Sequence, residues 1–380
     1  MAPDPDRHAG HGSGSRVVAS AFVHRPTVDI YNERGLDWAS AHRVPGRRAG
    51  AERFAGEVAH GSLRLDVGCG AGRYTGLLGT PVVGLDASRV MLGESRSLVP
   101  EAMYVQSDIE ALPFARGSLS GAWSWMTHHH IPRVRLPMAL WDLHRVLSEG
   151  SPFELQVLQG DDEGSDLVDH EVGGRFFATW TPERLVDVIV GAGFDVEEGT
   201  VAVSGDEVRL SAVRSRTLAD TVAPGMRLLI CGSNPSLHSA DAGVGYFRAG
   251  NRFWKAALAS GLVSRDRDPL HALRAEGIGM TDQVKRATRA ADEVTTDEYR
   301  QGLGRLERLV EWLQPKAVCL VGLGGWRAVV GSRARAGLQD ASLGGRPVYV
   351  MPSTSGLNAR TSPDQLADHL RAAMAVADGP

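Results

Sequence analysis

The chain has 380 residues, of which 43% are hydrophobic and 23% are charged, and its formal charge is −4. These proportions exclude a wholly disordered chain, and at roughly 150 residues per domain the length predicts two domains. The 45 glycines lack a three-residue period, which excludes a collagen-like protein.

The charge is unevenly distributed along the chain. Residues 1–225 contain 21 Lys and Arg against 30 Asp and Glu, a net charge of −9, whereas residues 226–380 contain 20 against 15, a net charge of +5. Basic surfaces attract the phosphates of nucleic acids. We therefore expect any bound DNA or RNA to contact the second half of the chain.

Cysteine usage and hydropathy indicate a compartment. The three cysteines, Cys69, Cys231 and Cys319, form no CxxC pair, which is typical of a reducing environment and cannot supply an all-cysteine iron–sulfur cluster. No apolar run approaches the ~20 residues of a membrane span, and residues 1–15 lack the apolar core of a signal peptide. We expect a cytoplasmic protein without a membrane partner, and a disordered tail over residues 1–26.

The first half alternates short apolar runs with helical stretches, which is the βαβ rhythm of a doubly wound parallel sheet. We expect helical structure over 27–60, and a helix over 182–193 that begins at Thr181-Pro182. The expected strands cover residues 63–68, 82–86, 103–108, 121–126, 152–158, 194–203 and 207–215.

The second half repeats this rhythm after a short linker, residues 217–225. Its expected strands cover residues 227–232, 317–322 and 347–352, and its expected helices cover 251–261, 297–313 and the stretch from Pro363 onward. The sequence therefore predicts an α/β protein with two doubly wound domains, over residues 27–216 and 226–380.

A glycine-rich loop follows the first predicted strand, in LRLDVGCGAGRY. Glycine allows sharp turns and a close approach of the backbone to a ligand. Asp86 ends the next strand, where a carboxylate suits two ribose hydroxyls, and Asp108 follows the third strand, where it suits an adenine amino group. These three strand ends together predict a nucleoside-containing cofactor.

This part of the chain resembles the class I S-adenosylmethionine-dependent methyltransferases, over residues 27–216. The resemblance implies that S-adenosylmethionine is the cofactor and that Asp86 binds its ribose and Asp108 with Ile109 its adenine. Four further residues would surround the methionine part: Asp66, Gly68, Gly70 and Gly72. A nicotinamide enzyme is the alternative, but GxGxxG is not the spacing here.

The methyl acceptor stays open. The chain has no Asn-Pro-Pro-Tyr-like motif and no Pro-Cys nucleophile of the kind found in DNA methyltransferases, which favours a small metabolite or an RNA base over duplex DNA. Three adjacent histidines, His128, His129 and His130, are expected at a helix entry or in the acceptor pocket, where one is a candidate general base. No matching Cys/His set accompanies them, so we expect no metal.

Two polar loops follow strands of the second half, CGSNPS (231–236) and MPSTSGLNAR (351–360), and NRFWK (251–255) begins a helix between them. Ligands of open α/β sheets bind at the carboxyl ends of strands, so the two loops are predicted to form the lips of one crevice. Asn234 can orient a water through its amide, although it is no strong base.

These three motifs resemble those of the mismatch-specific uracil/thymine-DNA glycosylases of the uracil-DNA glycosylase superfamily, over residues 226–377. The resemblance implies a partner: duplex DNA with a mismatched or damaged pyrimidine that is flipped out of the helix. It implies that Asn234 is catalytic and that Tyr246 stacks on the flipped base. The other expected base-pocket residues are Ser233, Pro235, Ser236 and Ser353.

The loop after the last strand is expected to contact DNA through Ser355, Gly356, Leu357, Asn358 and Arg360. The resemblance implies that Leu357 fills the hole that the flipped base leaves. An exposed leucine at a loop tip costs solubility, so its placement there needs a reason. By the same resemblance, residues 353–355 occupy the position at which the fastest uracil enzymes carry a histidine. In this chain the three residues carry neutral hydroxyls.

The scarcity of lysine argues against strand cleavage through a Schiff base, which needs an amine nucleophile. The chain contains only Lys255, Lys285 and Lys316, and Lys255 and Lys316 do not fall in a catalytic-looking loop. The sequence therefore predicts a monofunctional DNA glycosylase fused to a methyltransferase. The alternative is a methyltransferase for RNA or a small molecule whose second domain only binds nucleic acid. A third reading is a first domain that has lost catalysis and only binds S-adenosylmethionine or a partner.

Overall fold

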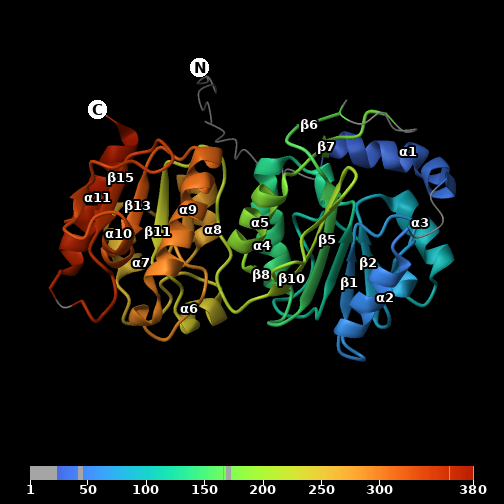
Figure 1. The fold of residues 1–380 in the computed structure, drawn as a ribbon, viewed down its shortest axis with the longest axis horizontal. Helices are drawn as coiled ribbons and strands as arrows, with labels where there is room; N and C mark the ends of the chain where they lie inside the picture. The colour runs from blue at the N-terminus through green and yellow to red at the C-terminus, as the bar shows by residue number, and fades with distance from the viewer. Residues whose placement is uncertain (1–23, 42–45, 166, 168–172, 359, 380) are drawn as a thin grey trace, which may run out of the picture.

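The computed structural model describes residues 24–41, 46–165, 167, 173–358 and 360–379. Figure 1 shows two α/β units side by side, the first in blue to green and the second in yellow to red. The expected tail over 1–26 falls outside the described residues up to position 23, and the first helix begins at Arg25.

The first unit is built on an eight-stranded sheet with the order β3-β2-β1-β4-β5-β10-β8, in which β9 pairs with β10. The first five strands of this order are parallel, and β10 runs antiparallel to β5 and to β8. Its strands are β1 Arg64–Val67, β2 Val82–Asp86, β3 Met103–Gln106, β4 Ala122–Trp125, β5 Pro152–Leu158, β8 Phe194–Val196, β9 Ala202–Ser204 and β10 Glu207–Arg214. A small hairpin, β6 (Glu163–Gly164) with β7 (Phe177–Ala178), lies apart from it.

Helices cover this sheet, and polar residues set their starts: Ser88 and Thr181 cap α3 and α5 through their hydroxyls. The elements are α1 Arg25–Ala41, α2 Arg48–Glu57, η1 Thr75–Leu77, α3 Arg89–Leu98, η2 His128–His130, η3 Arg133–Arg135, α4 Leu136–Val146 and α5 Pro182–Gly191. The stretch 27–60, expected to be helical, contains α1 and α2.

The second unit contains a five-stranded sheet with the order β12-β11-β13-β15-β14, parallel except for the edge strand β14. Its strands are β11 Leu228–Gly232, β12 Ile278–Asp282, β13 Val318–Val321, β14 Gly337–Leu338 and β15 Val348–Met351. The sequence analysis did not predict β12, although all five of its residues are buried. Its short run IGMTD interrupts the apolar pattern with a glycine and two polar residues.

Two apolar cores lie on the two faces of this sheet. Phe253, Trp254 and Leu370 belong to the core under α7 and α11, and Leu306 and Trp326 to the core under α9 and α10. The helices are α6 Leu237–Ala242, α7 Phe253–Ser260, α8 Pro269–Glu276, η4 Ala291–Glu293, α9 Thr296–Leu313, α10 Gly324–Val329 and α11 Pro363–Asp378. The predicted fold class, two α/β domains with a mostly parallel second sheet, is confirmed.

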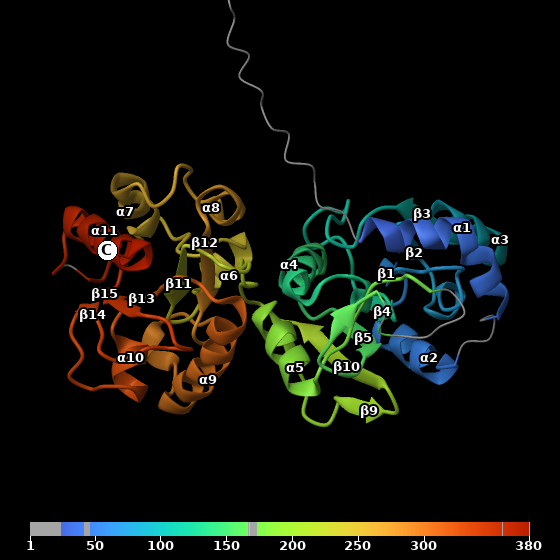
Figure 2. The ribbon, with the colours of Figure 1, turned by 90° about the horizontal axis from the view of Figure 1, so that it is seen from above.

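The two units pack against each other through α5 and α9, which Figure 2 shows facing one another. The rings of Trp180 and Trp312 meet edge to face at 6.2 Å, and Arg308 forms an ion pair with Asp187. Part of the expected linker packs into the second unit, since Thr221 pairs with Met280 of β12. Within the described residues, no helix is both long and apolar enough to cross a bilayer.

The carboxyl edges of the two sheets point in opposite directions. In Figure 1, α1 lies over the upper edge of the first sheet, whereas α6, which follows β11, lies at the lower edge of the second. A ligand at one edge is therefore remote from a ligand at the other.

Candidate functional site

A cavity of about 500 Å³ opens at the carboxyl ends of β1 and β2 in the first unit. Five of the seven predicted cofactor residues line it: Asp66, Gly68, Gly70, Asp86 and Ile109. The strand ends thus bring together residues that lie up to 43 positions apart in the sequence.

The carboxylate of Asp86 is fixed by the glycine loop. Its Oδ2 accepts a hydrogen bond from the Gly70 amide at 2.9 Å and its Oδ1 one from the Ser88 amide at 2.8 Å. Burial raises the pKa of this carboxyl, although the amide hydrogen bonds oppose the shift. Asp66 accepts from the Thr75 hydroxyl at 2.7 Å, and burial raises its pKa to about 7.

The glycines of the loop have separate roles. Gly68 and Gly70 adopt φ of +66° and +54°, and a Cβ on Gly68 would lie 2.2 Å from Cγ2 of Thr127. Gly72, at φ +82°, lies outside the cavity lining and packs against Ser95 of α3, whose Oγ would be 2.6 Å from an added Cβ.

Asp108, the remaining predicted cofactor residue, also lies outside the cavity lining. It is 8% exposed, and its Oδ1 accepts a hydrogen bond from the Glu110 amide at 2.9 Å. The neighbouring Ile109 lines the cavity with its buried side chain. A contact of Asp108 with adenine stays a prediction.

Residues that the sequence analysis did not single out for the site roof the cavity. Tyr31 of α1 accepts a hydrogen bond from the Arg175 guanidinium at 2.8 Å, and its hydroxyl lies 3.1 Å from Nε2 of His130. The ring of Phe177 packs at 4.9 Å from that of His130. Tyr31, Arg175 and Phe177 line the cavity together with His130, which the sequence analysis did place in the acceptor pocket. No local pattern signals the first three, because Tyr31 and Arg175 lie 144 positions apart.

The three histidines divide between core and cavity. His128 is 1% exposed, its Nδ1 lies 2.6 Å from the Ser124 hydroxyl, and burial lowers its pKa to about 4. His129 and His130 line the cavity. In the part of the chain that the structure describes, no group of three or more His, Cys, Asp or Glu is arranged to hold a metal.

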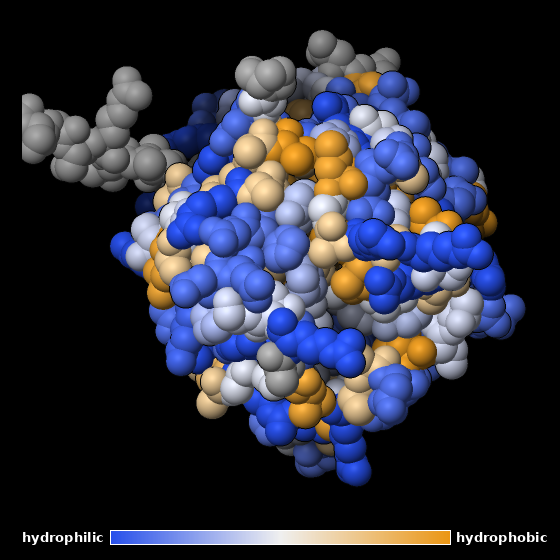
Figure 3. All heavy atoms as spheres, turned by 90° about the vertical axis from the view of Figure 1, so that its left-hand side faces the viewer, coloured by the Kyte–Doolittle hydropathy of each residue, from blue (hydrophilic) through white to orange (hydrophobic). Residues whose placement is uncertain are grey.

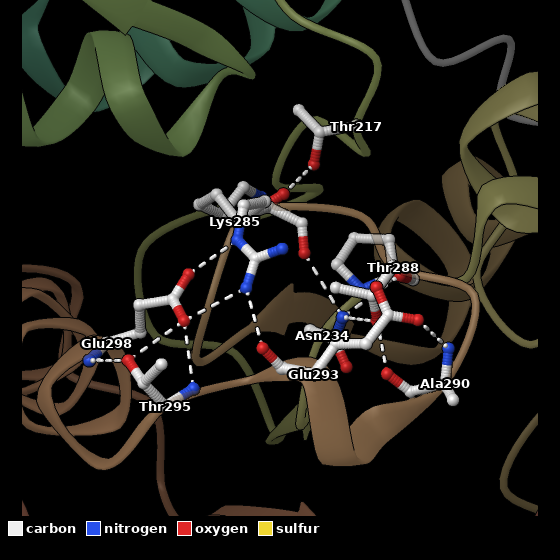
Figure 4. A network of polar contacts seen from close by, with 10 residues as sticks. Thr217, Asn234, Lys285, Thr288, Ala290, Glu293, Thr295 and Glu298 are labelled. Atoms are coloured by element: carbon white, nitrogen blue, oxygen red, sulfur yellow. Dashed lines mark hydrogen bonds and ion pairs between the residues drawn. The ribbon is translucent and has the colours of Figure 1, made fainter.

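In the second unit, Asn234 lies in the loop after β11, and its amide is held in one orientation mainly by the segment after β12 (Figure 4). Its Nδ2 donates to the Pro235 carbonyl at 3.2 Å, to the Arg286 carbonyl at 3.1 Å and to Oγ1 of Thr288 at 2.7 Å. The Thr288 hydroxyl donates onward to the Ala290 carbonyl, so its lone pairs face Nδ2. No described residue donates to Oδ1 of Asn234, which leaves that oxygen as an acceptor for water.

The neighbours of Asn234 shape its loop. The Ser233 hydroxyl lies 2.6 Å from the Tyr299 hydroxyl, and the Pro235 carbonyl accepts from the Thr288 amide. Ser236 caps α6, since its Oγ accepts from the Ser239 amide at 3.2 Å. Contacts of these residues with a base stay predictions.

Tyr246 lies beside the end of β11 in a left-handed conformation, with φ of +58°. Its ring stacks on Phe253 at 4.2 Å, and its buried hydroxyl has no hydrogen-bond partner among the described residues. A Cβ on Gly232 would lie 3.1 Å from this hydroxyl and 2.2 Å from Oδ1 of Asp282. Burial raises the pKa of Asp282 to about 6. The sequence analysis missed Asp282 because it missed β12.

Arg252 of the NRFWK motif organises the loop after β15, a role that the sequence analysis did not assign. Its guanidinium donates to the carbonyls of Thr361 at 2.6 Å, Ser355 at 3.0 Å and Asn358 at 2.7 Å. The Asn358 amide donates back to the Ser353 carbonyl at 2.8 Å. The NRFWK motif and the loop after β15, which lie far apart in the sequence, are thus in direct contact.

The tip of this loop is exposed. Leu357 is 93% exposed, the highest value among the large apolar residues described, and Arg360 is also exposed. Gly356 approaches the Gly250 carbonyl so closely that a Cβ would lie 2.8 Å from its oxygen. The loop lies on the side of the second unit that faces away from the first (Figure 1), and that side carries apolar residues in small separate groups (Figure 3).

Comparisons with protein families agree with this division into units. Residues 65–150 match the family model described as a methyltransferase domain, and residues 219–375 match that of the uracil DNA glycosylase superfamily. The chain is therefore a fusion of two α/β domains. One is a methyltransferase domain and the other a uracil DNA glycosylase superfamily domain.

Several solved structures are similar to about half of the chain. The 1,6-didemethyltoxoflavin-N1-methyltransferase of Burkholderia thailandensis is 19% identical with a TM-score of 0.41, over 51% of this chain and 91% of that one. A TehB-like S-adenosylmethionine-dependent methyltransferase of Corynebacterium glutamicum is 19% identical with a TM-score of 0.38, over 50% and 98%. One from Mesorhizobium loti is 19% identical with a TM-score of 0.36, over 44% and 99%.

Proposed function

We propose that the second unit is a monofunctional DNA glycosylase that removes uracil, thymine or a related damaged base opposite guanine in duplex DNA. The observation that carries this proposal is the fixed amide of Asn234. Three acceptors hold its Nδ2, and its Oδ1 faces no protein donor in the described chain. A pure binding module has no need for such an oriented acceptor.

Hydrolysis breaks the bond between the sugar C1′ and the base nitrogen, and it adds water to an oxocarbenium-like sugar. The Oδ1 of Asn234 accepts a hydrogen bond from that water and directs its oxygen toward C1′. The departing base carries the electron pair of the broken bond as an anion, which preorganised donors stabilise, and it takes up the proton that the attacking water loses. Tyr246 supplies an aromatic ring for stacking, and the amides and hydroxyls near Ser233 and Ser353 supply polar contacts.

The lysines support hydrolysis rather than strand cleavage. Lys285 is the lysine nearest in sequence to the residues that hold Asn234, but its Nζ forms an ion pair with Asp220 at 2.7 Å and its side chain is 10% exposed. An amine in this state is a poor nucleophile, because attack needs a free lone pair. The product is then an intact strand with an abasic site.

Contact with duplex DNA is assigned to the loop after β15. Leu357 is the proposed wedge that fills the hole of the flipped base, and Arg360 the proposed contact to the backbone or to the opposite guanine. The three hydrogen bonds from Arg252 to this loop support the proposal, because they hold the exposed leucine in a fixed position.

We propose that the first unit binds S-adenosylmethionine and transfers its methyl group to an unidentified acceptor. The cavity fits such a cofactor, because Gly68 and Gly70 leave its floor open and Asp86 offers a fixed carboxylate there. Asp66, Gly72, Asp108 and Ile109 complete the proposed binding residues. The cofactor supplies an electrophilic methyl group on a sulfonium, and the cavity-lining His129 and His130 are the candidates to take a proton from an acceptor.

The opposite directions of the two carboxyl edges support two independent reactions. A base flipped into the second unit is remote from the cavity of the first. This favours a methyl acceptor other than the excised base, and it agrees with the roof of Tyr31 and Arg175, which suits a small molecule or an unstacked base.

The test is base release by the full chain from end-labelled duplexes with G·U, G·T and A·U pairs, in EDTA, with alkali to cleave abasic sites. We expect alkali-dependent cleavage of the G·U duplex. Binding of the duplex without release of any base would favour the binding-module alternative, and cleavage without alkali would contradict simple hydrolysis.

A further inference from the structure

The segment that joins the two units contacts Lys285 at two points, and Figure 4 shows the first of them, at Thr217. The Thr217 hydroxyl donates to the Lys285 carbonyl, and the Asp220 carboxylate forms an ion pair with Nζ of Lys285 at 2.7 Å. Both Thr217 and Asp220 are at most 3% exposed. The contacts therefore fix both the backbone and the side chain of Lys285 away from bulk water.

The residues that follow Lys285 hold the amide of Asn234. The Arg286 carbonyl and the Thr288 hydroxyl both accept from Nδ2, and the Thr288 amide donates to the Pro235 carbonyl. A shift of Lys285 thus moves the acceptors that orient Asn234.

The joining segment is itself anchored to the first unit. The Asp220 amide donates to the Gly191 carbonyl at the end of α5, and the Ser215 amide donates to the Gly193 carbonyl. Nε2 of His144 in α4 lies 3.2 Å from the Ser215 carbonyl. Hydrogen bonds, joined by short stretches of backbone, therefore connect α4 and α5 of the methyltransferase domain to Asn234.

A second set of contacts involves the helix α6 and the turn that lead to Tyr246. Arg216 forms an ion pair with Asp241 of α6 at 2.7 Å. The guanidinium of Arg116 lies against Gly243, three residues before Tyr246, so that an added Cβ would be 2.2 Å from Nη2. Arg216 and Arg116 of the first unit thus contact the helix and turn that lead to Tyr246, while the joining segment contacts Lys285, which precedes the residues that hold Asn234.

We propose that Thr217, Asp220 and Lys285 are positioning residues for base excision, through which the methyltransferase domain completes the glycosylase site of its neighbour. The proposal rests on the proposed function of Asn234. Besides Lys285, the Asp220 carboxylate accepts hydrogen bonds from Arg305 at 2.8 Å and from the Thr281 hydroxyl at 2.6 Å. Removal of the lysine amine therefore leaves Asp220 with partners and the fold intact.

The test compares full-chain Thr217→Val and Lys285→Met with wild type in steady-state release of uracil from a G·U duplex. We expect kcat to fall about 5- to 100-fold with little change in KM, because a misplacement of about 1 Å can cost 10²-fold in rate. Lys285→Arg should recover most of the rate. Thr200→Val is the matched control, since Thr200 also donates to a backbone carbonyl but lies in the first unit away from this path.

The effect should disappear in an Asn234→Ala background, because these residues act through that amide. Equal losses in the two backgrounds, or unchanged kcat in both variants, would overturn the proposal.

Amide hydrogen exchange provides a readout that needs no activity. Thr217→Val should speed exchange over residues 284–290, and Thr200→Val should not. If wild type releases no base, the proposed function fails, and the exchange result alone decides whether the contact exists: unchanged exchange over 284–290 would refute it.

Discussion

Substitution of Gly68 tests the geometry of the cofactor loop, because the structure offers a matched partner in Gly70. Both glycines have positive φ, +66° and +54°. A Cβ on Gly68 would lie 2.2 Å from Cγ2 and 2.3 Å from Oγ1 of Thr127, whereas a Cβ on Gly70 would meet nothing closer than a Trp38 atom at 3.9 Å. The two alanine variants therefore share the backbone strain and differ in the clash.

The magnitudes follow from these contacts. An L-residue in the left-handed region costs about 1–2 kcal/mol, which applies to both variants. Overpacking against Thr127 adds about 1–3 kcal/mol for Gly68→Ala alone. For a domain of this size each kcal/mol lowers Tm by roughly 2–4 °C, so Gly68→Ala should melt about 2–12 °C below Gly70→Ala.

The assay is scanning calorimetry of both full-chain variants and of Gly68→Ala combined with Thr127→Ala. Removal of Cγ2 and Oγ1 from Thr127 should restore part of the lost stability, since neighbouring substitutions are not additive. Equal melting of Gly68→Ala and Gly70→Ala, or a strictly additive double variant, would refute the close approach of Gly68 to Thr127.

Three further predictions follow from single residues. Leu357→Ala should reduce base release from duplex DNA more than from single strands, without loss of stability. Leu98 is also exposed, and Leu98→Ala should change neither rate. Equal losses on both substrates would remove Leu357 from the wedge role. Asp86→Ala should weaken S-adenosylmethionine binding about 10- to 100-fold in titration calorimetry, because charge-assisted hydrogen bonds contribute about 1.5–3 kcal/mol, while exposed Asp195→Ala should bind like wild type. The lowered pKa of His128, about 4 against 6.5, means that the unfolded chain takes up the proton first, so stability should fall by about 3 kcal/mol as pH drops from 6.5 to 4. His128→Asn should lose that part of the pH dependence in urea unfolding; an unchanged profile would contradict the buried neutral ring.

The sequence predicted the parts of the fold that local patterns encode. Strands β1, β2 and β5 lie in short stretches rich in apolar residues, and almost all of their residues are buried, as expected for strands covered on both faces. The loops at their carboxyl ends follow from the parallel topology. Strand β12 escaped prediction because IGMTD is short and half polar, and its burial comes from the helices and strands around it. With β12 the sequence analysis also missed Asp282.

Site residues supplied by distant segments were beyond local reasoning. Tyr31 and Arg175 meet over the cavity although 144 positions separate them. The role of Arg252 depends on three carbonyls more than 100 positions away. The segment 217–225 is predicted as a short linker between the units, but the structure buries Asp220 in a network with Lys285 and Arg305 of the second unit, which lie 65 and 85 positions away.

The central claim is that Asn234 orients the water that releases the base, and single-turnover release of uracil from a G·U duplex by the full chain tests it most directly. Asn234→Ala should lower the rate at least about 10²-fold, the usual loss on removal of one preorganised polar group. Gln339→Ala is the matched amide control, because its backbone pairs with Val348 at the opposite end of β15 from the DNA-contacting loop, and it should act like wild type. Uracil release by Asn234→Ala within about threefold of the wild-type rate would contradict the account.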